Sequence, residues 1–136
     1  MRVFVDTNII AYAYDKDARD RHERAAELVK ELWTSTAPPY ISTQVLQELH
    51  ATLDKFGYEL ESTAKAVRHY MSWNVVAVTP PLIDSALNLR KRWKLSVWDS
   101  TIVAAALVAE TEQLWTEDMQ HEQEIEGLKI INPLLT

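Results

Sequence analysis

Hydrophobic positions divide the chain into short apolar runs that alternate with longer stretches of mixed character. Short runs rich in β-branched residues are typical of strands that are covered on both faces of a sheet. They predict strands at residues 3–5, 40–42, 75–79, 114–116 and 129–131. Apolar side chains that recur on one face of a helical wheel predict helices instead, at residues 8–14, 22–33, 45–56, 60–73, 82–94 and 101–109.

Residues that favour helix ends support these boundaries. Thr43 stands where the third helix needs an N-cap, and Gly57 follows the end of that helix. Strands that alternate with helices predict a parallel sheet between helical layers. The chain contains only two glycines, too few for the tight turns of an all-β fold. The predicted fold class is therefore α/β.

Length and composition limit the classes of protein. The chain has 136 residues, of which 47% are hydrophobic and 25% charged, so we expect residues 1–136 to form one globular domain. The net charge of −6 excludes a protein that binds nucleic acid through bulk positive charge alone. The absence of cysteine excludes disulfide frameworks, cysteine-ligated zinc and thiol nucleophiles.

No apolar run is long enough for a transmembrane helix. The first carboxylate, Asp6, also comes too early in the chain for the apolar core of a signal peptide. We therefore expect a cytoplasmic protein that makes no contact with a membrane.

Four acidic residues occupy positions from which they can converge. Asp6 follows the first predicted strand and Asp118 follows the fourth, and sites in parallel sheets lie beyond the carboxyl ends of the strands. Asp99 precedes the buried helix, and Glu48 borders the apolar face of the third helix. If these segments meet at one edge of the sheet, four carboxylates share one site.

Each acid also has a purely structural interpretation. Asp99 is a suitable N-cap for its helix, and Asp6 can cap the first helix or form an Asx turn with Asn8. Glu48 can be a solvated helix residue, and Asp118 can belong to a polar loop. Taken one at a time, these residues specify no site.

Taken together, the segments resemble a known pattern. Val-Phe-Val-Asp-Thr-Asn from residue 3, Gln-Glu-Leu around Glu48, Trp-Asp-Ser around Asp99 and Trp-Thr-Glu-Asp before residue 119 resemble, in order and spacing, the PIN-domain family and its VapC-like toxins. The resemblance covers nearly the whole chain. It implies a three-layer α/β fold with a short central parallel sheet flanked by helices. It also implies a metal-dependent endoribonuclease that forms a homodimer and pairs with an antitoxin protein.

The resemblance assigns roles to individual residues. It assigns catalysis and metal binding to the acidic quartet, Asp6, Glu48, Asp99 and Asp118. It assigns a supporting role around the quartet to Thr7, Asn8 and Thr116. Glu117 adjoins Asp118 and either can point into the site, but Asp118 keeps the family's Thr-x-Asp spacing and is preferred.

Four carboxylates in one cavity repel one another unless a cation neutralises them. Hard oxygen ligands without cysteine favour Mg²⁺ or Mn²⁺, as one or two ions. Such ions support hydrolysis of phosphodiester bonds by water, with RNA as the expected substrate. Two alternatives stay open: another metal-dependent phosphoesterase, acting on DNA or a small phosphate ester, or a non-catalytic α/β binding module.

A basic run precedes the Asp99 segment and offers contacts to RNA phosphates. The expected RNA-contacting residues are Arg90, Lys91, Arg92, Lys94 and Trp98, the last because an exposed tryptophan can stack on an unpaired base. The alternative is a solvated last helical turn, where cations are favourable in any protein.

Overall fold

The computed structural model describes residues 1–135. The strands are β1 (Val3–Val5), β2 (Tyr40–Ser42), β3 (Asn74–Val76), β4 (Gln113–Trp115), β5 (Glu124–Ile125) and β6 (Leu128–Ile131). The helices are α1 (Thr7–Tyr12), α2 (Asp20–Thr34), α3 (Thr43–Lys55), α4 (Leu60–Tyr70), α5 (Pro80–Trp93) and α6 (Val97–Val108), with a 3₁₀ turn, η1 (Lys16–Ala18), between α1 and α2.

The strands form one sheet in the order β3-β2-β1-β4-β6-β5. Neighbouring strands are parallel except β5, which pairs antiparallel with β6. The α/β prediction is confirmed, but β5 was not predicted, because its two residues are too few to show a strand pattern. The hairpin turn between β5 and β6 uses Glu126 and Gly127, both with positive φ (51° and 89°).

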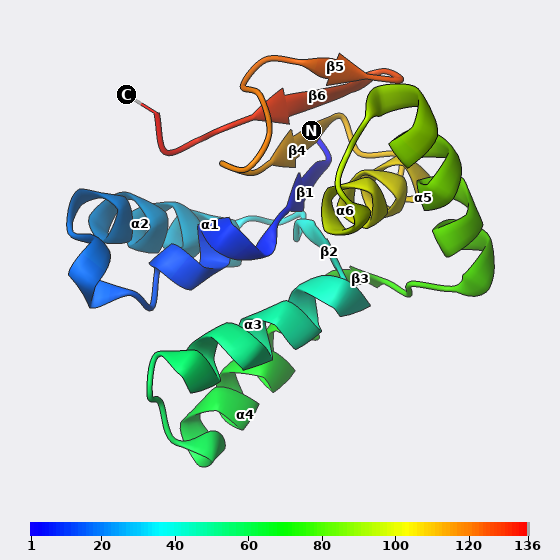
Figure 1. Cartoon of the computed structure of the whole chain (residues 1–136). Helices are drawn as coiled ribbons and strands as arrows, with labels where there is room; N and C mark the ends of the chain where they lie inside the picture. The colour runs from blue at the N-terminus through cyan, green and yellow to red at the C-terminus, as the bar shows by residue number, and fades with distance from the viewer. Residues whose placement is uncertain (136) are drawn as a thin grey trace.

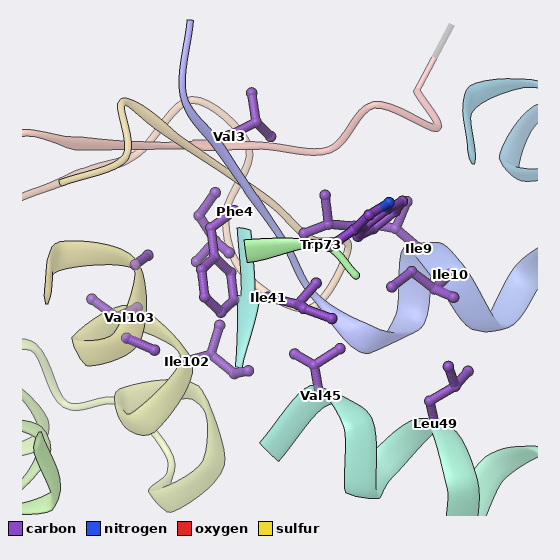
Figure 2. Packing of buried hydrophobic residues seen from close by; sticks show 14 of the residues in the cluster. Val3, Phe4, Ile9, Ile10, Ile41, Val45, Leu49, Trp73, Ile102 and Val103 are labelled. Carbon is purple, nitrogen blue, oxygen red and sulfur yellow. The ribbon is translucent and has the colours of Figure 1, made fainter. Parts of the chain in front are cut away.

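Helices cover both faces of the sheet. Figure 1 shows α1 and α2 on one side and α5 and α6 on the other, while α3 and α4 extend away beyond the end of β1. The core fills the space between these layers, and its apolar side chains include Phe4 of β1, Ile102 and Val103 of α6, and Val45 of α3 (Figure 2). Helix α6 buries nearly its whole circumference, as its apolar sequence predicts.

The N-cap of α3 differs from the prediction. Ser42, not Thr43, caps the helix, because Ser42 has an extended backbone and its hydroxyl accepts a hydrogen bond from the Val45 amide at 3.3 Å. Thr43 is the first helical residue, and its hydroxyl accepts from the Val78 amide at 3.1 Å. Gly57 follows the helix with a φ of 89°, as expected of a residue at a helix end.

Other boundaries move by a few residues. The helix expected at 60–73 ends at Tyr70, and the strand expected at 75–79 runs from Asn74 to Val76. This strand is short because β2 offers only three partner residues. No helix within residues 1–135 has the length and apolarity needed to cross a membrane.

Candidate functional site

Parallel pairing of β1 with β4 places Asp6 beside Thr116 at the carboxyl edge of the sheet. Val5 pairs with Trp115, and the Asp6 amide donates to the Trp115 carbonyl at 2.9 Å. The Thr116 hydroxyl then donates to Asp6 Oδ2 at 2.8 Å. Both side chains are buried, so this hydrogen bond forms inside the protein.

Asp6 is also the N-cap of α1, as its structural interpretation predicted. Its Oδ1 accepts from the Thr7 amide at 2.7 Å, while Oδ2 accepts from Thr116 and, at 3.4 Å, from Asn8. All of these donors are neutral. Within residues 1–135 no lysine or arginine forms an ion pair with this carboxylate, although only 4% of the residue is exposed.

Asn8, in the first turn of α1, joins this helix to the loop after β4. Its Nδ2 lies 3.0 Å from Asp118 Oδ2 and 3.2 Å from the Thr116 hydroxyl. Its Oδ1 accepts from the Glu117 amide at 3.3 Å. One side-chain amide therefore fixes the 116–118 loop and turns the Asp118 carboxylate toward Asp6.

Glu117 points elsewhere. Its carboxylate accepts a hydrogen bond from the Tyr12 hydroxyl and lies 3.5 Å from Nε of Arg21. Burial, together with this carboxylate, raises the pKa of Tyr12 to about 12, so the tyrosine stays a donor. Of the two adjacent acids, Asp118 contacts the Asp6 cluster through Asn8, whereas Glu117 fastens the loop to α1 and α2.

Glu48 approaches from α3, and each of its carboxylate oxygens has a donor. The Thr7 hydroxyl donates to Oε1 at 2.7 Å, and Gln44 Nε2 donates to Oε2 at 3.2 Å. The same Nε2 lies 3.3 Å from the Trp98 carbonyl at the start of α6. The sequence prediction missed Gln44, although its spacing of four residues from Glu48 places both on one helix face.

Asp99 lies in the first turn of α6 and is not its N-cap. Ser96 takes that place, and its hydroxyl accepts from the Asp99 amide at 3.1 Å. The carboxylate of Asp99 is thereby free of the capping role. Partial burial raises its pKa, and the negative charges of Asp118 and Glu48 raise it further against a lowering by Ser96.

The four carboxylates influence one another electrostatically. Burial raises the pKa of Asp6 from 3.8 to about 7; hydrogen bonds from Thr116 and Thr7 oppose the shift, and the charges of Glu48 and Asp118 add to it. An open cavity of about 400 Å³ is bordered by Asp6, Glu48 and Asp118, with small side chains of α1 and α3. Asp99 is not among the residues that border this cavity.

The side chains around Asp6 carry the kind of ligand atoms that a hard divalent cation prefers. Carboxylate, amide and hydroxyl oxygens surround a buried acid that has no positive partner, and such oxygens are the donors that Mg²⁺ and Mn²⁺ prefer. Within residues 1–135, no three acidic or histidine side chains are grouped closely enough to ligate an ion.

A comparison with family models decides the family. The model of the PIN domain matches residues 3–123, which include all four carboxylates. The chain belongs to the PIN domain family. A search of curated proteins finds no match.

Solved structures share the fold of this PIN domain. A toxin-antitoxin complex from Klebsiella pneumoniae is 22% identical, with a TM-score of 0.69 and 98% of each chain covered. VapC20 of Mycobacterium tuberculosis, a sarcin-ricin loop cleaving toxin, is 27% identical, with a TM-score of 0.66 over 85% of this chain and 91% of that one. VapBC2 of Rickettsia felis bound to a promoter DNA fragment is 19% identical, with a TM-score of 0.65 over 96% and 97%.

The basic residues before Asp99 differ in whether they form ion pairs. Arg92 forms an ion pair with Glu126 at 2.6 Å, and the Trp93 indole donates to the same carboxylate at 3.0 Å. Within residues 1–135 the other members, Arg90, Lys91 and Lys94, form no ion pair. Trp98 is 66% exposed and immediately precedes Asp99 in α6.

Proposed function

We propose that this PIN domain is a metal-dependent endoribonuclease, the toxin of a toxin–antitoxin pair, which hydrolyses RNA phosphodiester bonds at its four carboxylates. The observation that carries the proposal is Asp6, a buried acid without a cationic partner whose pKa is held near 7 beside other carboxylates. A protein retains such an unfavourable group where a ligand compensates for it. VapC20, a cleaving toxin of similar sequence, supports the same function.

In this proposal Asp6, Glu48, Asp99 and Asp118 hold one or two ions of Mg²⁺ or Mn²⁺. When bound, the cation supplies a water of lowered pKa and offsets negative charge on the phosphate. The chain's own residues prepare the ligands. Thr116 and the Thr7 amide fix both oxygens of Asp6, so this carboxylate loses little freedom when an ion binds.

Asn8 prepares Asp118 in the same way, since its amide donates to that carboxylate from a helix anchored by Asp6. Beyond the carboxylates, Trp98 offers an exposed indole to an unpaired base, and Arg90, Lys91 and Lys94 offer charge to the phosphates. Arg92 contributes less, because Glu126 already neutralises it. These features suit a single-stranded nucleic acid, and the resemblance to VapC-like toxins makes RNA the expected substrate.

We also propose two protein partners, an antitoxin and a second copy of this chain. The fold shared with a toxin-antitoxin complex and with VapBC2 supports the antitoxin, and the second copy is implied by the resemblance to VapC-like toxins alone. We expect this toxin to act in the cytoplasm, where its RNA substrates are. Size-exclusion chromatography with light scattering tests the homodimer directly, and a monomer at every concentration would contradict it.

The decisive experiment compares Asp99→Asn with the matched control Asp84→Asn, an exposed acid on α5. Purified proteins are incubated with RNA, single-stranded DNA and a small phosphate ester, with Mn²⁺ and with EDTA. We expect the wild type and the control to cleave RNA only with Mn²⁺, and Asp99→Asn to lose about 100-fold or more of that activity. Full activity in a folded Asp99→Asn variant would contradict the proposal, and equal cleavage of DNA or the ester would favour a broader phosphoesterase.

A further inference from the structure

Gln44 is a buried polar residue placed between two helices of the site. It lies in the first turn of α3 and is only 8% exposed. Its single amide nitrogen lies within hydrogen-bond distance of two acceptors, the Glu48 carboxylate at 3.2 Å and the Trp98 carbonyl at 3.3 Å. One donor group therefore joins α3 to the start of α6.

The orientation of this amide follows from its partners. A carboxylate and a carbonyl both accept hydrogen bonds, so the nitrogen must face them and the oxygen must face the other way. That oxygen, Oε1, is buried and has no hydrogen-bond partner within residues 1–135. An unpaired buried acceptor destabilises a fold, whereas a leucine of similar volume would fill the same space without that cost. Stability alone therefore does not explain a glutamine here.

The two acceptors lead to two different carboxylates. Glu48 is bonded directly, and Trp98 immediately precedes Asp99 in α6. Glu48 belongs to α3 and Asp99 to α6, and carboxylates of like charge repel each other when both are ionised. Gln44 opposes this separation, because its nitrogen attracts both the Glu48 carboxylate and the backbone beside Asp99.

We propose that Gln44 is a positioning residue that holds the Glu48 carboxylate in one orientation, beside the start of α6, for binding of the divalent cation. Thr7 fixes the other oxygen of Glu48, at 2.7 Å, so the two donors together define one orientation of the carboxylate. The inference rests on the proposed function. It adds a specific role to a residue that itself contributes no ligand.

The test compares Gln44→Leu with Gln47→Leu, an exposed glutamine on the same helix. Mn²⁺ affinity is measured by calorimetry, RNA cleavage as kcat and KM, and stability by urea unfolding in EDTA. For Gln44→Leu we expect about a tenfold weaker Mn²⁺ Kd, a similar loss of kcat at subsaturating Mn²⁺, and an RNA KM within twofold of the wild type. We expect unchanged or higher stability in EDTA, and a control variant that matches the wild type throughout.

A metal-free crystal structure of Gln44→Leu supplies a readout that does not depend on activity. We expect the Glu48 carboxylate to turn away from the start of α6, and an unmoved carboxylate would overturn the inference. Wild-type Mn²⁺ affinity in Gln44→Leu would also overturn it, as would a loss of affinity explained by a matching loss of stability. If the wild type itself binds no Mn²⁺, both the inference and the proposed function fail. If the wild type binds Mn²⁺ and Gln44→Leu binds it equally well, only the inference about Gln44 fails.

Discussion

Replacing Asp6 with asparagine measures how much the burial of this ionised carboxylate lowers the free energy of unfolding. Burial and the neighbouring charges raise the pKa of Asp6 from 3.8 to about 7. The folded protein therefore binds this proton more tightly than the unfolded chain, and the free energy of unfolding falls as pH rises from about 4 to about 7. Three units of pKa correspond to about 4 kcal/mol, which is the cost of the ionised carboxylate above pH 7.

The Asp6→Asn substitution avoids this cost because an amide does not ionise. The oxygen of the new side chain can still accept from the Thr7 amide. Its nitrogen faces the Thr116 hydroxyl, which already accepts from Asn8 and from the Asp118 amide and now loses the acceptor for its own proton. The hydrogen bonds that Asp6 Oδ2 accepts from Thr116, at 2.8 Å, and from Asn8, at 3.4 Å, are lost at a cost of about 1 kcal/mol each. We therefore expect Asp6→Asn to be about 2 kcal/mol more stable than the wild type at pH 8, and about 2 kcal/mol less stable near pH 4, where the wild-type carboxyl is protonated.

Urea unfolding followed by tryptophan fluorescence, from pH 4 to pH 8 in EDTA, measures this difference. The exposed variant Asp84→Asn serves as the control and should follow the wild type at every pH. An Asp6→Asn variant that is no more stable than the wild type at pH 8 would refute the claim that the buried carboxylate destabilises the fold. It is equally refuted if the gap between the two proteins stays constant across the range, because the effect must follow ionisation.

Two further predictions concern ligands. Mn²⁺ at 100 times its Kd should raise the wild-type free energy of unfolding by about 2.7 kcal/mol. Thermal melts should show a larger Tm increase at pH 8 than at pH 5, because protons compete with the ion for the carboxylates. The same Tm increase in Asp6→Asn would argue against a metal site at Asp6. Trp98→Ala removes an exposed indole, so it should change stability by less than about 0.5 kcal/mol. Because stacking on a base contributes about 1–3 kcal/mol, its RNA KM should rise at least about fivefold, and an unchanged KM in steady-state cleavage would exclude Trp98 as a stacking platform.

The local sequence predicted most of the fold because its signals come from neighbouring residues. The apolar pattern of α6, the strand before Asp6 and the glycine after α3 each depend on a few adjacent positions, and the structure confirms them. Predictions failed where two local signals competed. Ser42 and Thr43 are both good N-caps. The pairing of β2 with β3 keeps the backbone of Ser42 extended, and the Thr43 hydroxyl accepts a hydrogen bond from the Val78 amide instead of capping the helix.

The candidate site was predictable only in part, for the same reason. A carboxylate directly after a buried strand points to the edge of the sheet, so Asp6 and Asp118 could be singled out from their positions in the chain. Which of Glu117 and Asp118 faces Asp6 depends on Asn8 and Tyr12, more than 100 positions away. Such contacts arise from packing of distant elements, and local periodicity carries no information about them.

The sequence by itself determined the α/β alternation and the positions of the acids, since both are properties of short segments. Tertiary structure decided that Asp6 is buried with no lysine or arginine paired to it among residues 1–135, and that Gln44 reaches from Glu48 to the backbone of α6. The physical reason is that burial and the pKa of a side chain depend on every element packed around it, and only the folded chain brings those elements together.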